Sequence, residues 1–356
     1  MITHRAIKDN LVCVFIDDNF MRLNEPERVK STLSSMPLNL PVKIRDEKNR
    51  FMKALEGLGD AEEKRKAFRE MFYRTLGDAA EQEQCRFLVQ GTIKADVEET
   101  EGGIKTQHNV LEQIGINPVE RFGFNVIEPV ASLYKYQVRE VARYLSAPPE
   151  VSERQPFPGP GLSVRVVGEI TNEKLYELKK ATVLIENGLE PHSPDQYFGA
   201  IFSGKTSMAP RALTRNTAEA LNIDESRIDA SFLIEKATGI VDGERAYGNV
   251  AAIKVFDSSR GLLEMGYGEL EAIRKAAQEG YPGITRVLVL VRSMDKGEYA
   301  IALRAIRTRD YITASLAEIS WKTLSEVSNK VLDGCPKVSN VYFDLTPKPP
   351  GTIEFE

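Results

Sequence analysis

The sequence has few of the residues that mark disulfide-rich or metal-binding proteins. Among 356 residues there are 3 cysteines, 3 histidines and 1 tryptophan. The cysteines, Cys13, Cys85 and Cys335, are odd in number and far apart, which excludes CxxC-type metal ligation. Such sparse cysteine usage is typical of a reducing compartment, so we expect a cytoplasmic protein.

Long apolar runs and an excess of positive charge are also missing. No stretch approaches the roughly 20 apolar residues of a membrane-spanning helix, and residues 1–10 contain no apolar signal core. The 47 basic and 52 acidic residues give a net charge of −5. We therefore expect neither a membrane nor a nucleic acid as a partner.

The first half of the chain alternates short apolar segments with charged helical patterns. Strands are expected at residues 11–16, 42–44, 86–90 and 124–127, and helices at residues 47–56, 61–76 and 133–145. This alternation predicts an α/β fold with a doubly wound parallel sheet. Because ligands bind at the carboxyl ends of the strands in such sheets, Asp17, Gly91 and Thr92 are expected to line a ligand site.

The composition changes at residues 155–161, where QPFPGPG contains three prolines and two glycines. Such a string forms neither a regular helix nor a central strand. We place a domain boundary before it, which gives a first domain at residues 1–154 and a second, small α+β domain at residues 155–356. In the second domain we expect strands at residues 164–167, 286–292, 299–306 and 340–344, and helices at residues 172–187 and 312–332.

Residues 188–268 do not fit this order and are too long for a loop in a compact domain. We interpret them as an insertion with its own helices and a hairpin near residues 239–257. The segment contains GAIFSGKT at residues 199–206, which formally matches a phosphate-binding loop. Such a loop requires a strand before it, and EPHSP at residues 190–194 is not a strand, so we do not expect one here.

Six strings of sequence carry a resemblance to a known family. They are, in chain order, VFID at residues 14–17, EKRK at 63–66, QGTIKADV at 90–97, KTQHN at 105–109, QPFPGPGL at 155–162 and KPPGTIE at 348–354. Together they are similar to strings of the ATP-pyrophosphatase subunit of GMP synthase, in order and over nearly the whole chain. The proline-rich string and the C-terminal string are highly specific together.

The resemblance implies a reaction, its cofactors and a partner. ATP, with Mg²⁺, adenylates the C2 oxygen of xanthosine monophosphate (XMP) and releases pyrophosphate, and ammonia then displaces AMP to give GMP. The ammonia comes from a glutaminase, and no cysteine of this chain lies in a Gly-x-Cys-x-Gly elbow. A separate glutamine amidotransferase subunit is therefore the implied partner, and the family also pairs the second domain into a homodimer.

The resemblance assigns the ATP site to the first domain. The implied residues are Asp17, Asn19, Gly91 and Thr92 for ATP, Asp96 for Mg²⁺ bound to pyrophosphate, and Lys105 and His108 for the departing phosphates. Taken alone, these residues also permit a plainer interpretation. They could form an ordinary polar turn after a strand, a solvated aspartate and a solvated basic turn.

The XMP site is assigned to the two most specific strings. The implied residues are Pro158, Gly159, Gly161 and Arg165 around the proline-rich string, and Lys348, Thr352, Ile353 and Glu354 in the C-terminal string. A fixed arginine can hold a phosphate bidentately. Lys348 would meet the phosphate, and residues 353 and 354 would meet the purine. The plainer alternatives are a rigid interdomain linker and a frayed tail.

The chain also departs from the family pattern. The family's SGGVDS loop, which cradles pyrophosphate, is expected about fifteen to twenty residues before Cys13, and only the tail of the following helix, residues 4–7, is present. Gln107 and Gln155 stand where the family has histidine. We therefore expect little ATP-pyrophosphatase activity from the chain as written. A catalytically degenerate protein that binds purine nucleotides, or a ligase for another substrate, stay open as alternatives.

Overall fold

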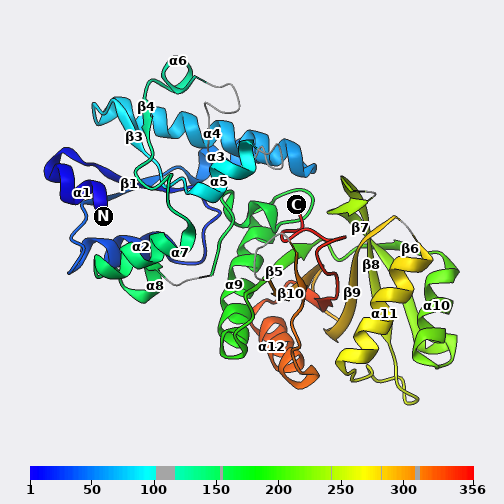
Figure 1. Cartoon of the computed structure of the whole chain (residues 1–356). Helices are drawn as coiled ribbons and strands as arrows, with labels where there is room; N and C mark the ends of the chain where they lie inside the picture. The colour runs from blue at the N-terminus through cyan, green and yellow to red at the C-terminus, as the bar shows by residue number, and fades with distance from the viewer. Residues whose placement is uncertain (102–116, 153–154, 242, 282, 309–312) are drawn as a thin grey trace. The chain divides into compact units, whose positions relative to one another are not determined.

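The computed structural model describes residues 1–101, 117–152, 155–241, 243–281, 283–308 and 313–356. These residues divide into two compact units (Figure 1). The first unit consists of Met1–Asn19, Asn24–Ala54 and Ala67–Gln155, and the second of Phe20–Leu23, Leu55–Lys66 and Pro156–Glu356.

The first unit contains the predicted alternation of helices and short strands. Its elements are α1 (Ile2–Ile7), the 3-10 helix η1 (Lys8–Asn10), β1 (Cys13–Asp17), α2 (Glu25–Ser34), β2 (Val42–Asp46), α3 (Lys48–Leu55), α4 (Ala61–Gln82), β3 (Phe87–Val89), α5 (Lys94–Glu101), α6 (Pro118–Phe122), β4 (Asn125–Ile127), α7 (Lys135–Tyr144) and α8 (Pro149–Ser152). The first residues of α4, up to Lys66, belong to the second unit. Local chemistry sets the helix ends: α6, for example, starts after Asn117, whose side chain caps it, and stops at Gly123, which has a left-handed φ.

The strands of the first unit pair in parallel, as predicted, but they form two separate sheets. β1 pairs with β2, from Cys13 opposite Val42 to Asp17 opposite Asp46, and β3 pairs with β4. Among the described residues no further strand joins these two pairs. The expected single doubly wound sheet is therefore replaced by two two-stranded sheets.

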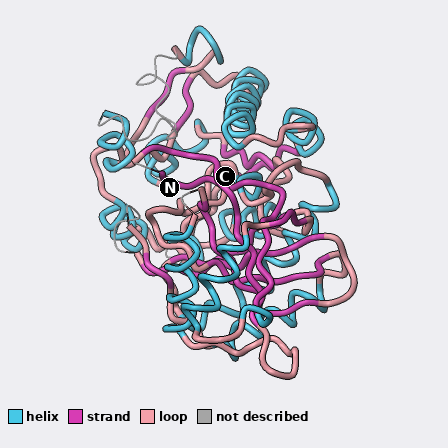
Figure 2. Tube along the Cα trace, turned by 90° about the vertical axis from the view of Figure 1, so that its right-hand side faces the viewer, coloured by secondary structure: helices cyan, strands magenta, loops and turns pink. Residues whose placement is uncertain are grey.

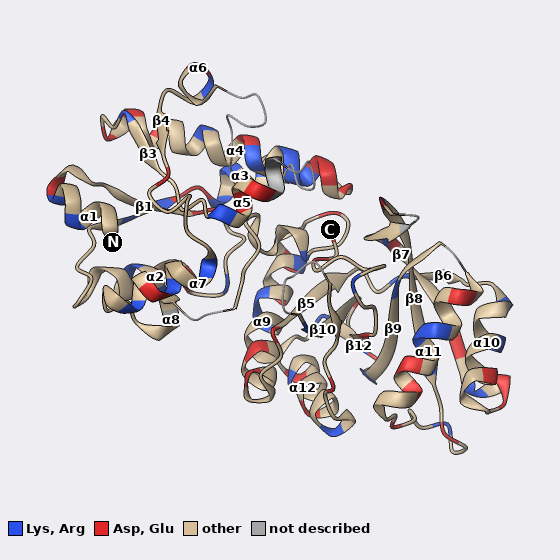
Figure 3. Ribbon diagram, viewed as in Figure 1, with Lys and Arg blue, Asp and Glu red and all other residues tan. Residues whose placement is uncertain are grey.

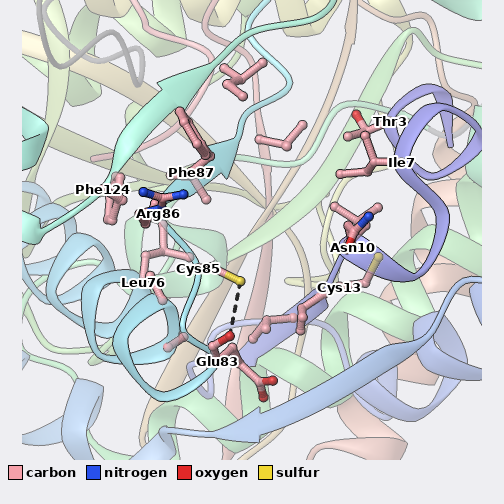
Figure 4. Close-up of a pocket in the computed structure, with 18 of the residues that line it drawn as sticks. Thr3, Ile7, Asn10, Cys13, Leu76, Glu83, Cys85, Arg86, Phe87 and Phe124 are labelled. Carbon is pink, nitrogen blue, oxygen red and sulfur yellow. Dashed lines mark hydrogen bonds between the residues drawn. The ribbon is translucent and has the colours of Figure 1, made fainter.

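An apolar cavity lies between the two strand pairs. Residues of β1 and of β3 line the same space of about 810 Å³. Figure 4 shows Ile7 and Cys13 on one side of it, and Leu76, Phe87 and Phe124 on the other. β1 and β3 therefore face a common hollow in place of a shared ladder of hydrogen bonds.

The second unit is the larger one. Its elements are the 3-10 helix η3 (Gly161–Val164), α9 (Asn172–Leu189), η4 (Glu190–His192), β5 (Gln196–Phe202), β6 (Thr206–Met208), α10 (Arg211–Leu221), η5 (Glu225–Arg227), β7 (Ile228–Val241), β8 (Glu244–Val255), α11 (Tyr267–Gly280), β9 (Ile284–Ser293), β10 (Tyr299–Arg307), β11 (Ser315–Leu316), α12 (Trp321–Gly334) and β12 (Val338–Asp344). The expected strands at residues 286–292, 299–306 and 340–344 correspond to β9, β10 and β12.

These strands form one eight-stranded mixed sheet. Its order is β11-β10-β12-β9-β8-β7-β6, and β5 pairs antiparallel with β10. The β10–β12 and β8–β9 pairs are parallel, whereas β9–β12 and β7–β8 are antiparallel. Helices α9 and α12 pack together against this sheet, and so do α10 and α11. Figure 2 shows the strands in magenta with the helices in cyan around them.

Residues 188–268, interpreted from the sequence as an insertion, are integral to this sheet. They contribute β5, β6, β7 and β8, and the last two form the hairpin that was expected there. β5 buries Phe198, Ala200 and Phe202 in the apolar core. Gly199 therefore belongs to a core strand and not to a phosphate-binding loop.

Two predicted elements have other boundaries. The strand expected at residues 164–167 is absent: η3 ends at Val164, and Val166 makes a single bridge to Ile201. The helix expected at residues 312–332 begins only at Trp321, because the Ser320 side chain accepts a hydrogen bond from the backbone of Thr323 and caps it there. Part of the preceding segment forms β11 instead.

Helices α4, α9, α10 and α11 each contain both basic and acidic residues, drawn blue and red in Figure 3. Such mixed faces are typical of helices with one side toward solvent. Within the described ranges, no helix combines the length and the apolarity needed to cross a membrane.

Candidate functional site

The carboxyl ends of β1 and β2 hold the first expected ATP residues. Asp17, the last residue of β1, has a side chain only 8% exposed, and its Oδ1 accepts the backbone N–H of Asn19 at 3.3 Å. The Nζ atom of Lys48 lies 3.2 Å from a carboxylate oxygen of both Asp17 and Asp46. These two carboxylates, Asp17 first, raise the pKa of Lys48. Asn19 has φ 73°, a left-handed conformation that asparagine tolerates.

The ends of β3 and β4 hold the second group. Thr92 is buried, and its Oγ1 donates a hydrogen bond to Oε1 of Glu128 at 2.5 Å. Gly91 precedes it with an exposed backbone, and no atom lies within 4 Å of where a Cβ would be. A ligand can therefore approach this peptide closely.

Asp96 lies in the first turn of α5. Its Oδ2 accepts the backbone N–H of Ile93 at 3.0 Å, so the carboxylate bonds back to the residue that precedes the helix. Burial and the neighbouring Arg139 lower the pKa of Lys135, and Asp96 acts against this shift. Asp96 is thus an anionic group close to a cation. The expected phosphate contacts Lys105 and His108 lie outside the described residues.

In the described part of the chain, no three His, Cys, Asp or Glu side chains lie close enough to hold a metal ion together. A single carboxylate such as Asp96 suits a Mg²⁺ ion that is bound mainly by phosphate oxygens and water. It does not suit an ion held by the protein alone.

The proline-rich string forms a tight turn in the second unit. The carbonyl of Pro158 accepts the N–H of Gly161 at 2.9 Å, and that of Phe20 accepts the N–H of Leu162 at 2.7 Å. Gly161 has φ +60°, and a Cβ there would lie 2.4 Å from the Phe20 oxygen, so only glycine fits. Around Gly159 the space is open. Its backbone is therefore accessible to a ligand.

Arg165 follows this turn and is almost fully buried, with its side chain 1% exposed. Its Nε and Nη2 donate to the two carboxylate oxygens of Glu354 at 2.8 and 2.9 Å. The guanidinium also lies 3.9 Å from the ring centre of Phe198 and 5.2 Å from that of Phe157. Its third nitrogen, Nη1, has no hydrogen-bond partner among the described residues. The fold thus joins the two most specific strings through a pair 189 residues apart.

Buried arginines hold the C-terminal string in place. Nη2 of Arg286 donates to the oxygens of Thr352 at 2.9 Å and to the carbonyl of Glu354 at 2.6 Å. Arg304 donates to Asp344 at 2.6 Å and to the Thr352 carbonyl at 3.2 Å. Burial, followed by the repulsion of Arg304, lowers the pKa of Arg286 to about 9, and Asp344 opposes this shift. A tail held by so many charge-assisted bonds is packed, so the frayed-tail alternative is wrong.

The remaining residues of the string are also fixed. Ile353 packs against the apolar core of the sheet, which includes Phe355. At the other end of the string, the backbone N–H and C=O of Lys348 pair with those of Ala314 at 2.8 and 3.0 Å. The stretch from Lys348 to Glu354 is therefore anchored at both ends.

Known proteins match the chain well beyond these strings. Residues 286–355 match the family model described as GMP synthase C terminal domain. The chain is 41% identical over its whole length to the B subunit of glutamine-hydrolyzing GMP synthase from Saccharolobus solfataricus and covers 90% of that protein. The B subunits of the same name from Sulfurisphaera tokodaii and Methanopyrus kandleri are 41% and 36% identical, again over the whole chain and 90% and 88% of their own lengths.

The chain belongs to the family of GMP synthase B subunits. The family resemblance inferred from six strings is thereby confirmed. The segment that matches the family model contains Glu354 of the C-terminal string. It also contains Arg286 and Arg304, which bind this string, and their partner Asp344.

Several residues of this site received no role from the sequence. Arg22 forms a bidentate pair with Glu186, at 2.8 Å, and its guanidinium lies 4.1 Å from the ring centre of Phe157. Phe157 lies in the proline-rich string shared with the GMP synthase family, so its position alone could have found it. Arg286 and Arg304 could also have been identified from the sequence. Each is a charged residue inside an apolar strand, and such a residue needs a buried partner.

Proposed function

We propose that this chain is the synthetase subunit of a GMP synthase, which aminates XMP to GMP at the expense of ATP. The C2 oxygen of XMP attacks the α-phosphorus of ATP, a new O–P bond forms, and the bond to pyrophosphate breaks. Ammonia then attacks C2, a C–N bond forms, the nitrogen loses a proton, and AMP leaves. The full-length similarity to proteins of that name supports this reaction. Because those relatives are named as one subunit of a glutamine-hydrolyzing enzyme, a separate glutamine amidotransferase is supported as the ammonia donor.

The Arg165–Glu354 pair carries the proposal for XMP. Nε and Nη2 of Arg165 are bound to Glu354, whereas Nη1 has no protein partner in the part of the chain described. A buried guanidinium with an unused donor is costly unless an acceptor arrives, and a phosphate or purine oxygen is such an acceptor. The carboxylate of Glu354 is more open, 16% exposed, and suits a purine N–H donor.

The neighbouring residues complete this site in the proposal. Pro158, Gly159 and Gly161 form the turn whose backbone a nucleotide can approach, and Thr352 and Ile353 precede Glu354 on the packed string. Lys348 supplies a second cation for the phosphate.

ATP is proposed to bind at the carboxyl ends of the strands of the first unit. The residues that would contact it are Asp17, Asn19, Gly91 and Thr92, with Lys105 and His108 toward the departing phosphates. Mg²⁺, when bound, would neutralise phosphate charge while pyrophosphate departs. Asp96 would hold it with one carboxylate, as the donor set allows.

A homodimer through the second unit is part of the same proposal, since the family resemblance implies it. Light scattering of the purified chain should give twice the monomer mass. A monomer at high micromolar concentration would contradict this assignment.

Calorimetry with XMP tests the proposed site. The parent should bind XMP, and Arg165→Ala and Lys348→Ala should each weaken binding roughly ten- to a hundredfold, because each charge-assisted hydrogen bond contributes about 1.5–3 kcal/mol. Arg215→Ala is the matched control, since Arg215 is an exposed arginine of α10, 59% accessible. If the parent binds and both site variants bind equally well, the assigned XMP site is wrong.

A further inference from the structure

The backbone after Arg165 is bound by two buried lysines. Nζ of Lys64 donates to the carbonyls of Val166 and Gly168, both at 2.8 Å. Nζ of Lys174 donates to the carbonyl of Val167 at 2.5 Å. Three consecutive carbonyls therefore each meet an ammonium group. Lys64 lies in the EKRK string, in the first turn of α4, and has no role in the proposed reaction.

The last residue of the chain binds the same segment from the other side. Oε1 of Glu356 accepts the backbone N–H of Gly168 at 2.8 Å and the hydroxyl of Tyr247 at 3.1 Å. Its carboxylate also forms an ion pair with Lys64, and the side chains of Glu356 and Lys64 are 0% and 1% exposed. Lys64, Gly168 and Glu356 thus form one closed junction.

The buried ion pair of this junction is not expected to add much to the stability of the fold. Burial lowers the pKa of Lys64 and raises the pKa of Glu356, because the loss of water outweighs their mutual attraction. A buried pair of this kind is often no more stabilising than apolar residues of the same size, so another use has to be sought.

The two sides of the junction are close in sequence to Arg165 and Glu354, the two paired residues of the proposed XMP site. Val166 follows Arg165, and Glu356 lies two residues after Glu354. Between them, Phe355 is fully buried against the rings of Phe198 and Phe202. A shift of the junction would therefore move Arg165 and Glu354 relative to each other.

We propose that Lys64 and Glu356 are positioning residues for XMP. By binding residues 166–168 to the end of the chain, they keep Arg165 and Glu354 at the spacing in which both meet the ligand. This inference rests on the proposed XMP site and adds two residues that touch no substrate. A displaced guanidinium would lose its bond to the ligand although it is still present.

The test is XMP calorimetry on Glu356→Gln and Lys64→Met, with thermal unfolding of each protein. Both variants should bind XMP about tenfold more weakly than the parent. Glu326→Gln and Lys330→Met are matched controls at exposed positions of α12 and should bind as the parent does. If Lys64→Met does not fold, Glu356→Gln decides, since it keeps the size of the side chain and an acceptor for Gly168.

A second arm separates positioning from general damage. In an Arg165→Ala background, Glu356→Gln should cause no further loss of affinity, because it acts through Arg165. The double variant Lys64→Met with Glu356→Gln should regain thermal stability relative to Lys64→Met, since no unpaired buried charge remains, yet still bind XMP weakly.

The outcomes distinguish this inference from the proposed function. If Arg165→Ala weakens XMP binding but Glu356→Gln and Lys64→Met bind as the parent does, the positioning role is wrong and the XMP site stands. If the losses simply add in the Arg165→Ala background, the junction does not act through Arg165. If Arg165→Ala itself binds XMP like the parent, the site assignment has failed and this inference fails with it.

Discussion

The two units of this chain organise polar residues in opposite ways. In the first unit, two separate two-stranded sheets border a cavity of about 810 Å³, and Lys48 beside Asp17 is 43% exposed. In the second unit, a single eight-stranded sheet buries Arg165, Arg286 and Arg304 almost completely.

The contrast indicates how each unit can serve its ligand. The proposed XMP site of the second unit has groups that are fixed before any ligand arrives, by charge-assisted bonds inside the core. The proposed ATP residues of the first unit lie at strand ends near water, where ion pairs hold side chains only weakly. We therefore expect the second unit to be rigid and sensitive to single substitutions, and the first to be tolerant.

The largest contrast should come from two aspartates. Asp344→Asn leaves the buried Arg286 and Arg304 without a charged partner, and should lower the free energy of unfolding by about 3–5 kcal/mol. Asp46→Asn removes an exposed contact of Lys48 and should change it by less than about 1 kcal/mol. Urea unfolding followed by circular dichroism measures both variants, and the fluorescence of Trp321, the one tryptophan, follows the second unit separately. If Asp344→Asn shifts the unfolding free energy no more than Asp46→Asn does, the two units do not differ in this respect.

Two glycines with left-handed backbones give a finer measure of the contrast. Gly161→Ala in the second unit combines a strained φ, about 1–2 kcal/mol, with an overlap on the Phe20 carbonyl that adds about 1–3 kcal/mol. Gly123→Ala in the first unit has the same backbone strain and no atom within 4 Å, so only the first of these terms applies. If both substitutions lower the free energy of unfolding by the same amount, the turn at Gly161 adjusts to admit a methyl group without cost.

A larger apolar side chain should stabilise the first unit and destabilise the second. Ala80→Leu points added methyl groups at the cavity of the first unit and should stabilise it by about 0.5–1 kcal/mol. Ala252→Leu overfills the core of β8 and should destabilise the second unit by about 1–3 kcal/mol. Thermal unfolding of both variants measures this. Destabilisation by Ala80→Leu would mean that the cavity walls do not admit a larger side chain.

The smallest effect concerns thiol reactivity. Burial raises the pKa of Cys335 to about 12, so its thiolate fraction at pH 8 is on the order of 10⁻⁴. Cys85 of the first unit is only partly buried and should be alkylated by iodoacetamide at least roughly 10²-fold faster. Peptide mass spectrometry over a time course separates the two sites. Comparable rates would indicate that α12 opens readily.

Much of the fold follows from local patterns in the sequence. Apolar runs located β9, β10 and β12 to within about two residues, and the parallel pairing of β1 with β2 agrees with the strand–helix alternation. The pattern failed at β5, because its pairing partner β10 was assigned to a smaller domain and residues 188–268 were set aside as an insertion, although the β7–β8 hairpin was expected within them. It also failed before Trp321, where the cap at Ser320 rather than apolar periodicity sets the start of the helix.

Part of the candidate site could be predicted from the sequence. Arg165 and Glu354 could be named because both lie in or beside family strings, but their pairing across 189 residues is a property of the fold. The same holds for Lys64 and Glu356, whose spacing in the sequence gives no hint of contact. Lys105 and His108 stay predictions.

A crystal structure of this chain with XMP bound would decide which unit holds the substrate. We predict that the ligand lies within hydrogen-bond distance of Arg165 or Glu354 in the second unit, between the proline-rich turn and the C-terminal string. XMP bound only in the first unit, with the Arg165–Glu354 pair unchanged and distant from it, would show that the second unit does not hold the substrate.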